Sequence, residues 1–264
     1  MTAPVSRRPP APFLNAVVAA RDRITARLVR ITLTGADLHR LVAPQPASSI
    51  RLLMPDPAHP DRIDVPDWDG NRFVRPDGSR PALRTMTPRG HDPGRGELRL
   101  EVVTHGVGLA STWAASAGLG TPVALSGPAR GHDIDGTATF LVLGGDETAY
   151  AAVSSLIEAA ALELQILAVL ETADGQAPPL PSHPGLESEV LPQVAGQPGR
   201  ALAARLGSQD LPPDGRLWAA GEAAAMQELR RRLFGDRGLP RGQATIRGYW
   251  KFGRTSDQAA GDDN

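Results

Sequence analysis

The chain has 264 residues, of which 41% are hydrophobic and 22% charged. This composition can fill one large or two ordinary cores and is not that of a disordered chain. The formal net charge is −1, which argues against nucleic acid or an anionic membrane as a partner, because both require a basic surface. The absence of cysteine excludes disulfides, cysteine-held iron–sulfur clusters and thiol catalysis.

The ends and the hydropathy of the chain give an expectation about its location. Arg7 and Arg8 are not followed by an apolar run, so we predict no secretory signal. No stretch reaches the roughly 18 apolar residues of a membrane helix. We therefore expect a cytoplasmic protein that does not insert into a membrane.

The first half of the chain has the pattern of β-strands. Residues 1–12 are rich in proline and alanine and predict a flexible arm. Residues 13–135 contain short alternating segments separated by turns, which predict a small antiparallel β-barrel. The predicted strands lie within 13–34 and at 48–54, 83–89, 96–104 and 121–126, with a long loop at 56–80. Because Pro88 cannot donate a ladder hydrogen bond, the third of these strands should end or bulge there.

The pattern changes in residues 136–247, where apolar strands alternate with helical segments. Such alternation predicts a parallel sheet with helices on both faces, the fold of an α/β nucleotide-binding domain. The predicted strands are 138–143, 165–170, 186–191 and 217–220, and the predicted helices 147–161, 199–207 and 223–234. Residues 248–264 form a predicted C-terminal tail.

The first candidate site is the run Arg84-Thr85-Met86-Thr87, immediately before Pro88. It combines an arginine with a hydroxyl residue three positions later, at a strand end that Pro88 distorts. An arginine favours planar, bidentate contact with phosphate. The alternative is an ordinary strand end with a solvated arginine.

The second candidate site lies between a strand and a short helix. It includes His105, Gly106, Gly108, Ala110, Ser111 and Thr112. Glycines there let the backbone approach an anion, and the helix N-terminus favours phosphate. The alternative is a glycine turn capped by Ser111.

Two further candidates follow strands of the second half. One contains Gly145, Asp146, Glu147 and Thr148, and the other Gly221 and Glu222. Ligands of open α/β sheets bind at the carboxyl ends of strands, so these residues predict a nucleotide side of the site. Asp146 is also suited to be a helix N-cap, and the two roles are compatible. No residues with metal-ligand spacing stand out, so we expect no metal site.

These segments together resemble the siderophore-interacting proteins, a family of ferredoxin-reductase-like flavoproteins. That family has an R-x-Y-T-x-R run, an H-G-x-x-G-P-A-S-x-W-A segment, G-D-E-T-A, A-G-E and a C-terminal G-Y-W-x-x-G. The matching residues here run in the same order over about residues 13–253. Two positions depart from the pattern: Met86 replaces the tyrosine and Leu109 the proline.

The resemblance implies roles for particular residues. Arg84 would meet the FAD pyrophosphate, the Thr87 hydroxyl would approach the flavin near N5, and Met86 would take the place of the tyrosine against the flavin. The resemblance implies that Thr87 and Met86 are catalytic, that Thr85 and the segment 105–112 also contact FAD, and that Trp250 covers the flavin ring. The alternative for Trp250 is packing on the core.

The resemblance also implies a function. The protein is expected to reduce Fe(III) in a siderophore, with electrons from NAD(P)H or a ferredoxin passing through FAD. Glu171 and Asp174, after the second strand of the nucleotide domain, would repel a 2′-phosphate, which favours NADH. Two alternatives remain: another flavin-dependent reaction on a biosynthetic intermediate or free flavin, which Met86 favours, and non-enzymatic binding of a ferric siderophore or nucleotide.

Overall fold

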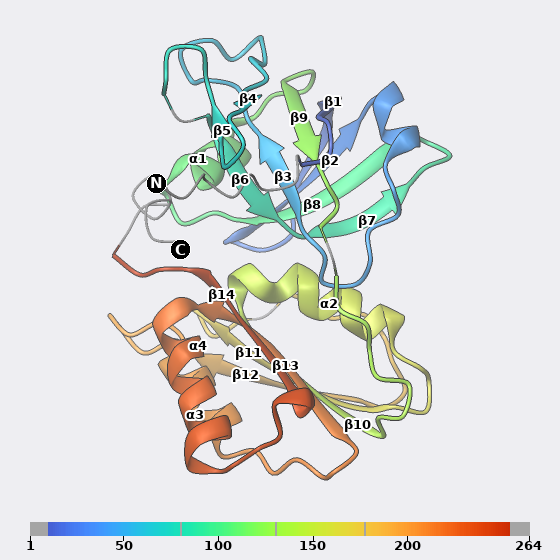
Figure 1. The fold of residues 1–264 in the computed structure, drawn as a ribbon, viewed down its shortest axis with the longest axis vertical. Helices are drawn as coiled ribbons and strands as arrows, with labels where there is room; N and C mark the ends of the chain where they lie inside the picture. Colours follow the sequence, from blue (N-terminus) through green and yellow to red (C-terminus); the bar gives the residue numbers. More distant parts are fainter. Residues whose placement is uncertain (1–9, 80, 130, 177, 254–264) are drawn as a thin grey trace, which may run out of the picture. The chain divides into compact units, whose positions relative to one another are not determined.

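The computed structural model describes residues 10–79, 81–129, 131–176 and 178–253. The chain forms two compact units, Met1–Gly131 and His132–Asn264, each of which is described by itself (Figure 1). Most of the predicted arm and the tail beyond residue 253 lie outside the described residues.

The first unit is built on a seven-stranded antiparallel sheet with the order β6-β3-β9-β1-β2-β8-β7. Its elements are β1 (Leu14–Arg23), β2 (Leu28–Thr34), the 3-10 turn η1 (Ala36–Arg40), β3 (Ile50–Leu53), β4 (Asp67–Trp68), β5 (Phe73–Val74), β6 (Leu83–Met86), β7 (Pro88–Asp92), β8 (Glu97–Val103), α1 (Leu109–Ser116) and β9 (Pro122–Ser126). β4 and β5 form a separate two-stranded hairpin within the predicted long loop.

The connection between β6 and β7 makes this sheet curl. The two strands lie at opposite ends of the hydrogen-bonded order, yet only Thr87 separates them in the chain. The two ends of the sheet must therefore approach each other, as in a barrel. The predicted antiparallel β-barrel is thus confirmed as a curled sheet.

The alternation predicted for two of these strands is also confirmed. Ile31 and Leu33 of β2, and Leu98 and Leu100 of β8, are fully buried in one core. The prediction of a single strand over 83–89 is wrong, because β6 ends at Met86 and β7 begins at Pro88. The expected irregularity at proline is present, since the β7–β8 register shifts between Pro88 and Gly90.

The second unit has a five-stranded parallel sheet with the order β12-β11-β10-β13-β14. Its elements are β10 (Phe140–Asp146), the 3-10 turn η2 (Glu147–Ala149), α2 (Tyr150–Ala159), β11 (Gln165–Thr172), β12 (Leu186–Pro192), α3 (Arg200–Gly207), β13 (Gly215–Glu222), α4 (Ala223–Arg230), the π-helical turn η3 (Arg231–Asp236), the 3-10 turn η4 (Arg241–Gln243) and β14 (Ala244–Trp250). The predicted parallel α/β fold is confirmed.

Helices cover both faces of this sheet. α3 and α4 pack side by side on one face, while α2 packs on β10 and β11 from the other (Figure 1). The cluster beneath α3 and α4 joins Val142 and Leu217 of the strands to Leu202, Leu206 and Met226 of the helices. One strand escaped the sequence analysis: the tail was predicted to start at residue 248, whereas β14 runs to Trp250.

Candidate FAD and electron-transfer site

The pairing of β6 with β3 shows which face of the sheet each residue of the first candidate site occupies. Arg84 pairs with Leu52, Met86 with Ile50, and Thr85 with Arg51. Residues opposite each other on paired strands share a face and successive residues alternate. Arg84 and Met86 therefore share the face of the buried Leu52 and Ile50, and Met86 packs against that core.

The two threonines of this run occupy different positions. Thr85 is exposed beside Arg51, on the face opposite Arg84. Thr87 is half-buried in the link between β6 and β7. The guanidinium of Arg84 donates to the carbonyl of Leu83 at 2.8 Å. Arg84 and Met86, but not Thr85, thus occupy a common side of the strand.

The second candidate segment forms a turn that leads into α1. The buried hydroxyl of Ser111 accepts hydrogen bonds from the backbone N–H groups of His105 (2.9 Å) and Gly106 (3.2 Å). Ala110 packs against the core of the unit, whereas Thr112 is exposed. Ser111 thus caps the turn, as the alternative from sequence expected, and holds it next to the helix start.

The start of α1 is open to an anion. Within the described part of the chain, no side chain caps its first turn at Gly108. Gly106 and Gly108 both have φ of +82°, a conformation that favours glycine. A Cβ on Gly106 would meet no described atom within 4 Å, and one on Gly108 only His105 Cε1 at 4.0 Å. Free N–H groups, open space and the helix dipole fit a phosphate.

The acidic candidates of the second unit are buried at the ends of neighbouring strands. Asp146 Oδ1 accepts from the N–H (2.9 Å) and hydroxyl (2.6 Å) of Thr148, which confirms it as the N-cap of η2. Asp146 Oδ2 accepts from Trp250 Nε1 at 2.7 Å. Burial raises the pKa of Asp146 above its usual range, although the bonds from Thr148 and Trp250 oppose the shift.

Glu222 and Glu147 differ in burial and in partners. Glu222 is buried and accepts from the N–H groups of Ala225 (2.8 Å) and Phe252 (3.1 Å). Glu147 is half-buried and accepts from Ala173 N at 3.4 Å. The motif glycines Gly145 and Gly221 lie within β10 and β13, one residue before Asp146 and Glu222.

Sequence reasoning missed the role of Glu171. It is the register partner of Asp146 on β11 and is buried. Its carboxylate accepts from Gly199 N (2.5 Å) and Leu202 N (2.9 Å) at the start of α3. The sequence does show an acidic residue at the end of an apolar strand. The hydrogen-bond partners of Glu171 could not be predicted, because they lie about thirty positions further along the chain. Glu171 thus bonds to the start of α3, and the preference for NADH that it suggested in the sequence stays a prediction.

The described ranges contain no candidate for a metal site or a membrane-spanning helix. No group of three or more His, Asp or Glu residues there lies close enough together to hold a metal ion. Burial and the nearby Arg247 lower the pKa of His132. None of the described helices is long and apolar enough to cross a membrane.

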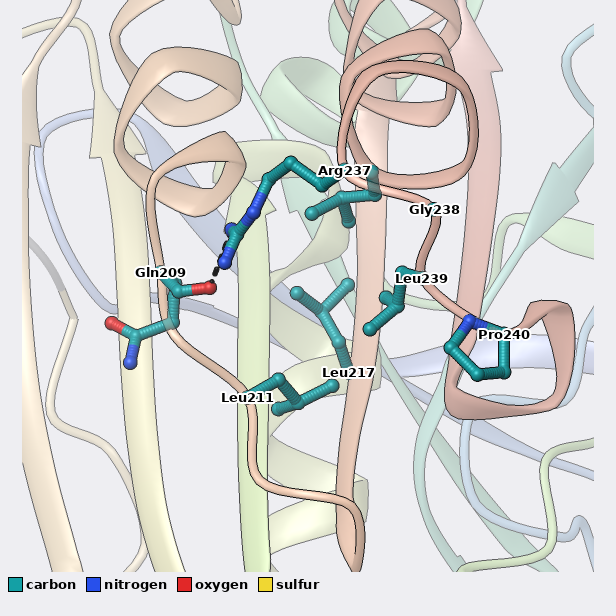
Figure 2. Close-up of a pocket in the computed structure, with 8 residues that line it drawn as sticks. Gln209, Leu211, Leu217, Arg237, Gly238, Leu239 and Pro240 are labelled. Carbon is teal, nitrogen blue, oxygen red and sulfur yellow. Dashed lines mark hydrogen bonds between the residues drawn. The ribbon is translucent and has the colours of Figure 1, made fainter.

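A small cavity of about 220 Å³ lies near the amino end of β13 (Figure 2). Arg237, at its rim, donates to the carbonyls of Gly207 (3.0 Å) and Gln209 (2.7 Å) and to Asp210 Oδ1 (3.0 Å). Those contacts tie neighbouring segments of the chain together. Since ligands of open α/β sheets bind at the carboxyl ends of the strands, this cavity is not a candidate for the site.

Comparison with known proteins agrees with the division of the chain into two units. Residues 17–132 match the siderophore-interacting FAD-binding domain, and residues 138–253 match the siderophore-interacting protein domain. The fold is that of ferredoxin-reductase-like flavoproteins, as more distant solved structures also show. The chain belongs to the siderophore-interacting protein family, which confirms the resemblance found in the sequence.

Three relatives illustrate the similarity. A siderophore utilization protein from T. fusca is 30% identical, with a TM-score of 0.82 over 94% of this chain and 96% of that one. An uncharacterized protein of Mycobacterium tuberculosis is 30% identical over 91% of this chain and 90% of its own length. The ferric vibriobactin reductase ViuB of Vibrio cholerae is 27% identical over 89% of this chain and 88% of its own.

Proposed function

We propose that this protein is an FAD-dependent oxidoreductase that reduces Fe(III) held in a siderophore and so releases Fe(II). The observation that carries the proposal is the open start of α1, with two positive-φ glycines beside it. Family membership and the 27% identity to a ferric vibriobactin reductase support the same reaction.

Residues of the first unit fit the chemistry of FAD. The N–H groups at the start of α1 would receive phosphate oxygens, with Gly106 and Gly108 leaving room for them. The Arg84 guanidinium would add bidentate contacts to the pyrophosphate. Met86, on the same face of β6, would pack against the flavin ring, and the Thr87 hydroxyl would hydrogen-bond near N5. Bound FAD would accept electrons from the donor, singly or as a pair, and pass them one at a time to Fe(III).

The release of iron follows from charge. Siderophores hold Fe(III) with hard oxygen ligands, and the attraction between a cation and its ligands falls with cation charge. Each iron takes one electron and becomes Fe(II), which holds the same oxygens less strongly. Two classes of electron donor fit this reaction, a reduced nicotinamide dinucleotide and a reduced ferredoxin.

An anaerobic assay tests the proposal. Purified protein loaded with FAD is reduced chemically and mixed with several ferric chelates and a colorimetric ferrous trap. We expect one ferrous ion per electron delivered, and no product when the protein has been stripped of FAD. Failure to take up FAD, or reoxidation by oxygen but by none of the ferric chelates, would contradict it.

A second candidate function rests on Met86. The family tyrosine has a flat ring and a hydroxyl, whereas Met86 has a flexible thioether that packs against the core. The methionine leaves a differently shaped space beside the flavin, which would suit another flavin-dependent reaction on a small molecule. Rapid oxidation of a reduced donor in the absence of iron, coupled to such a substrate, would favour this alternative.

A further inference from the structure

Three buried carboxylates line the carboxyl ends of neighbouring strands in the second unit. Asp146 ends β10, Glu171 lies one residue before the end of β11, and Glu222 ends β13. Asp146 and Glu171 are register partners, and Gly145 is level with Ala220 on β13. This group, here named the acidic edge, occupies the place where open α/β sheets bind nucleotides.

Each carboxylate of the acidic edge already serves the start of a helix or turn. Asp146 accepts from Thr148 N at the start of η2, Glu171 from Leu202 N in α3, and Glu222 from Ala225 N in α4. A carboxylate there satisfies the N–H groups and the helix dipole that would otherwise attract a phosphate. A dinucleotide pyrophosphate would instead have to approach three buried carboxyl groups, whose oxygens already accept the N–H groups that a phosphate would use.

The motif glycines of this unit make room for the chain itself. A Cβ on Gly221 would lie 2.7 Å from Asp146 Oδ2, and one on Gly145 would lie 2.7 Å from Ala149 Cβ. Their space is therefore filled by a carboxylate and a methyl group. Gly106 in the first unit differs, because its Cβ position is free of described atoms within 4 Å. The glycine loop of the first unit has room for a ligand, and these glycines do not.

The remaining oxygens of the acidic edge hold the C-terminal aromatic segment. Asp146 Oδ2 accepts from Trp250 Nε1 at 2.7 Å, and Glu222 Oε1 accepts from Phe252 N at 3.1 Å. The two rings meet edge to face, with centroids 6.4 Å apart. Both acidic motifs of the second unit thus bond directly to the segment from Trp250 to Phe252.

We infer that the acidic edge holds the chain's own segment 250–252, with Asp146 and Glu222 as positioning residues, and that it does not take the pyrophosphate of a nicotinamide dinucleotide. The inference rests on the proposed function, because the question of an electron donor arises only for a reductase. The electrons then come from a donor that needs no phosphate site on this sheet, which a reduced ferredoxin satisfies.

Binding of nucleotide fragments tests the exclusion. The FAD-loaded protein is titrated by calorimetry with ADP-ribose and with 2′-phospho-ADP-ribose, which carry the pyrophosphate without the nicotinamide. We expect no saturable binding below about 1 mM for either probe. Arg200 is an exposed guanidinium at the start of α3, next in the chain to Gly199, whose N–H donates to Glu171. Micromolar binding that Arg200→Ala weakens would overturn the inference, while FAD uptake and chemically driven ferric reduction report separately on the proposed function.

The positioning role is tested with Asp146→Asn. Asparagine has one acceptor oxygen where aspartate has two, so it cannot serve both Thr148 and Trp250. Acrylamide quenching of Trp250, obtained by difference from the matching Trp250→Phe protein, should increase severalfold in Asp146→Asn. Glu171→Gln is the matched control, because Glu171 has the same register on the next strand and bonds to α3 instead.

Either of two results overturns the positioning role: unchanged quenching in Asp146→Asn, or an equal increase in Glu171→Gln. Should Asp146→Asn fail to fold, Trp250→Phe removes the same hydrogen bond from the other side and keeps an aromatic ring. The backbone N–H of Phe252 should then exchange with deuterium several times faster than in the unaltered protein. An unchanged exchange rate would contradict the inference.

Discussion

The hydroxyl of Ser111 is the acceptor for the backbone N–H of His105, at 2.9 Å, and so ties the glycine turn to α1. Ser111→Ala should cost about 1 kcal/mol of stability, the net value of a typical hydrogen bond. It should also weaken FAD binding, because the turn is no longer held. Denaturant unfolding and FAD titration check both effects. Ser116→Ala is the control, since the Ser116 hydroxyl donates to Thr112 O within its own helix; equal losses in both variants would contradict a role for the turn.

Arg84 offers a second test of the FAD site. If its guanidinium meets the pyrophosphate, Arg84→Ala should weaken FAD binding by about 1.5–3 kcal/mol, the range for hydrogen bonds to charged groups. Arg84→Lys should recover only part of that loss, because the forked geometry is missing. Arg51→Ala is the control, as Arg51 lies on the neighbouring strand with Thr85, on the opposite face. Retention of FAD by Arg84→Ala through desalting would exclude the assignment.

The sequence was sufficient for the two units and for most strands because their signals are local. Alternation identified β2 and β8, whose buried faces match the pattern, and the alternating strands and helices identified the parallel sheet. The break at Thr87 was not predictable from alternation alone. β6 pairs with β3 and β7 pairs with β8, at opposite ends of the curled sheet; the irregularity at Pro88 was expected, but this change of partner strand was not.

The acidic residues show the same limit at the candidate site. The sequence placed Asp146 and Glu222 correctly at strand ends, because each follows an apolar run. Their assignment to a nucleotide was made without knowledge of their partners, which lie far away in the chain at Trp250 and Phe252, and the exclusion of a nucleotide pyrophosphate is our inference. Glu171 was judged by its distance from a strand end, whereas its carboxylate turns toward α3. The local sequence pattern predicts where a residue lies in a strand. Its hydrogen-bond partners, which can be distant in the sequence, are found only in the structure.

The ion pair between Asp135 and Arg216, at 2.6 Å, predicts a pH dependence of stability. Bonds from Thr137 and then Arg216 lower the pKa of Asp135 from 3.8 to about 2. Because the folded pKa lies below the unfolded one, the contribution is present above about pH 4 and is lost as the pH falls toward 2. Asp135→Asn should therefore be less stable than the unaltered protein at pH 7, with the gap closing below pH 4. Asp61→Asn, in an exposed loop, controls for the loss of one charge; a gap independent of pH would contradict the prediction.

Met86 provides the most discriminating substitution, because it stands where the family has a tyrosine and faces the same side of β6 as Arg84. Stacked aromatic pairs contribute roughly 0.5–1.5 kcal/mol beyond area burial, and sulfur–aromatic contacts roughly 0.3–1.5 kcal/mol. The two side chains therefore overlap in strength but differ in rigidity and hydrogen bonding. Met86→Tyr should tighten FAD binding modestly and leave ferric reduction intact or faster, as measured by FAD titration and the ferrous trap. Met86→Leu is the control for loss of the sulfur at similar volume. Tight FAD binding with loss of the native reaction in Met86→Tyr would instead mean that Met86 opens space for a substrate, and would favour the alternative reaction on a small molecule.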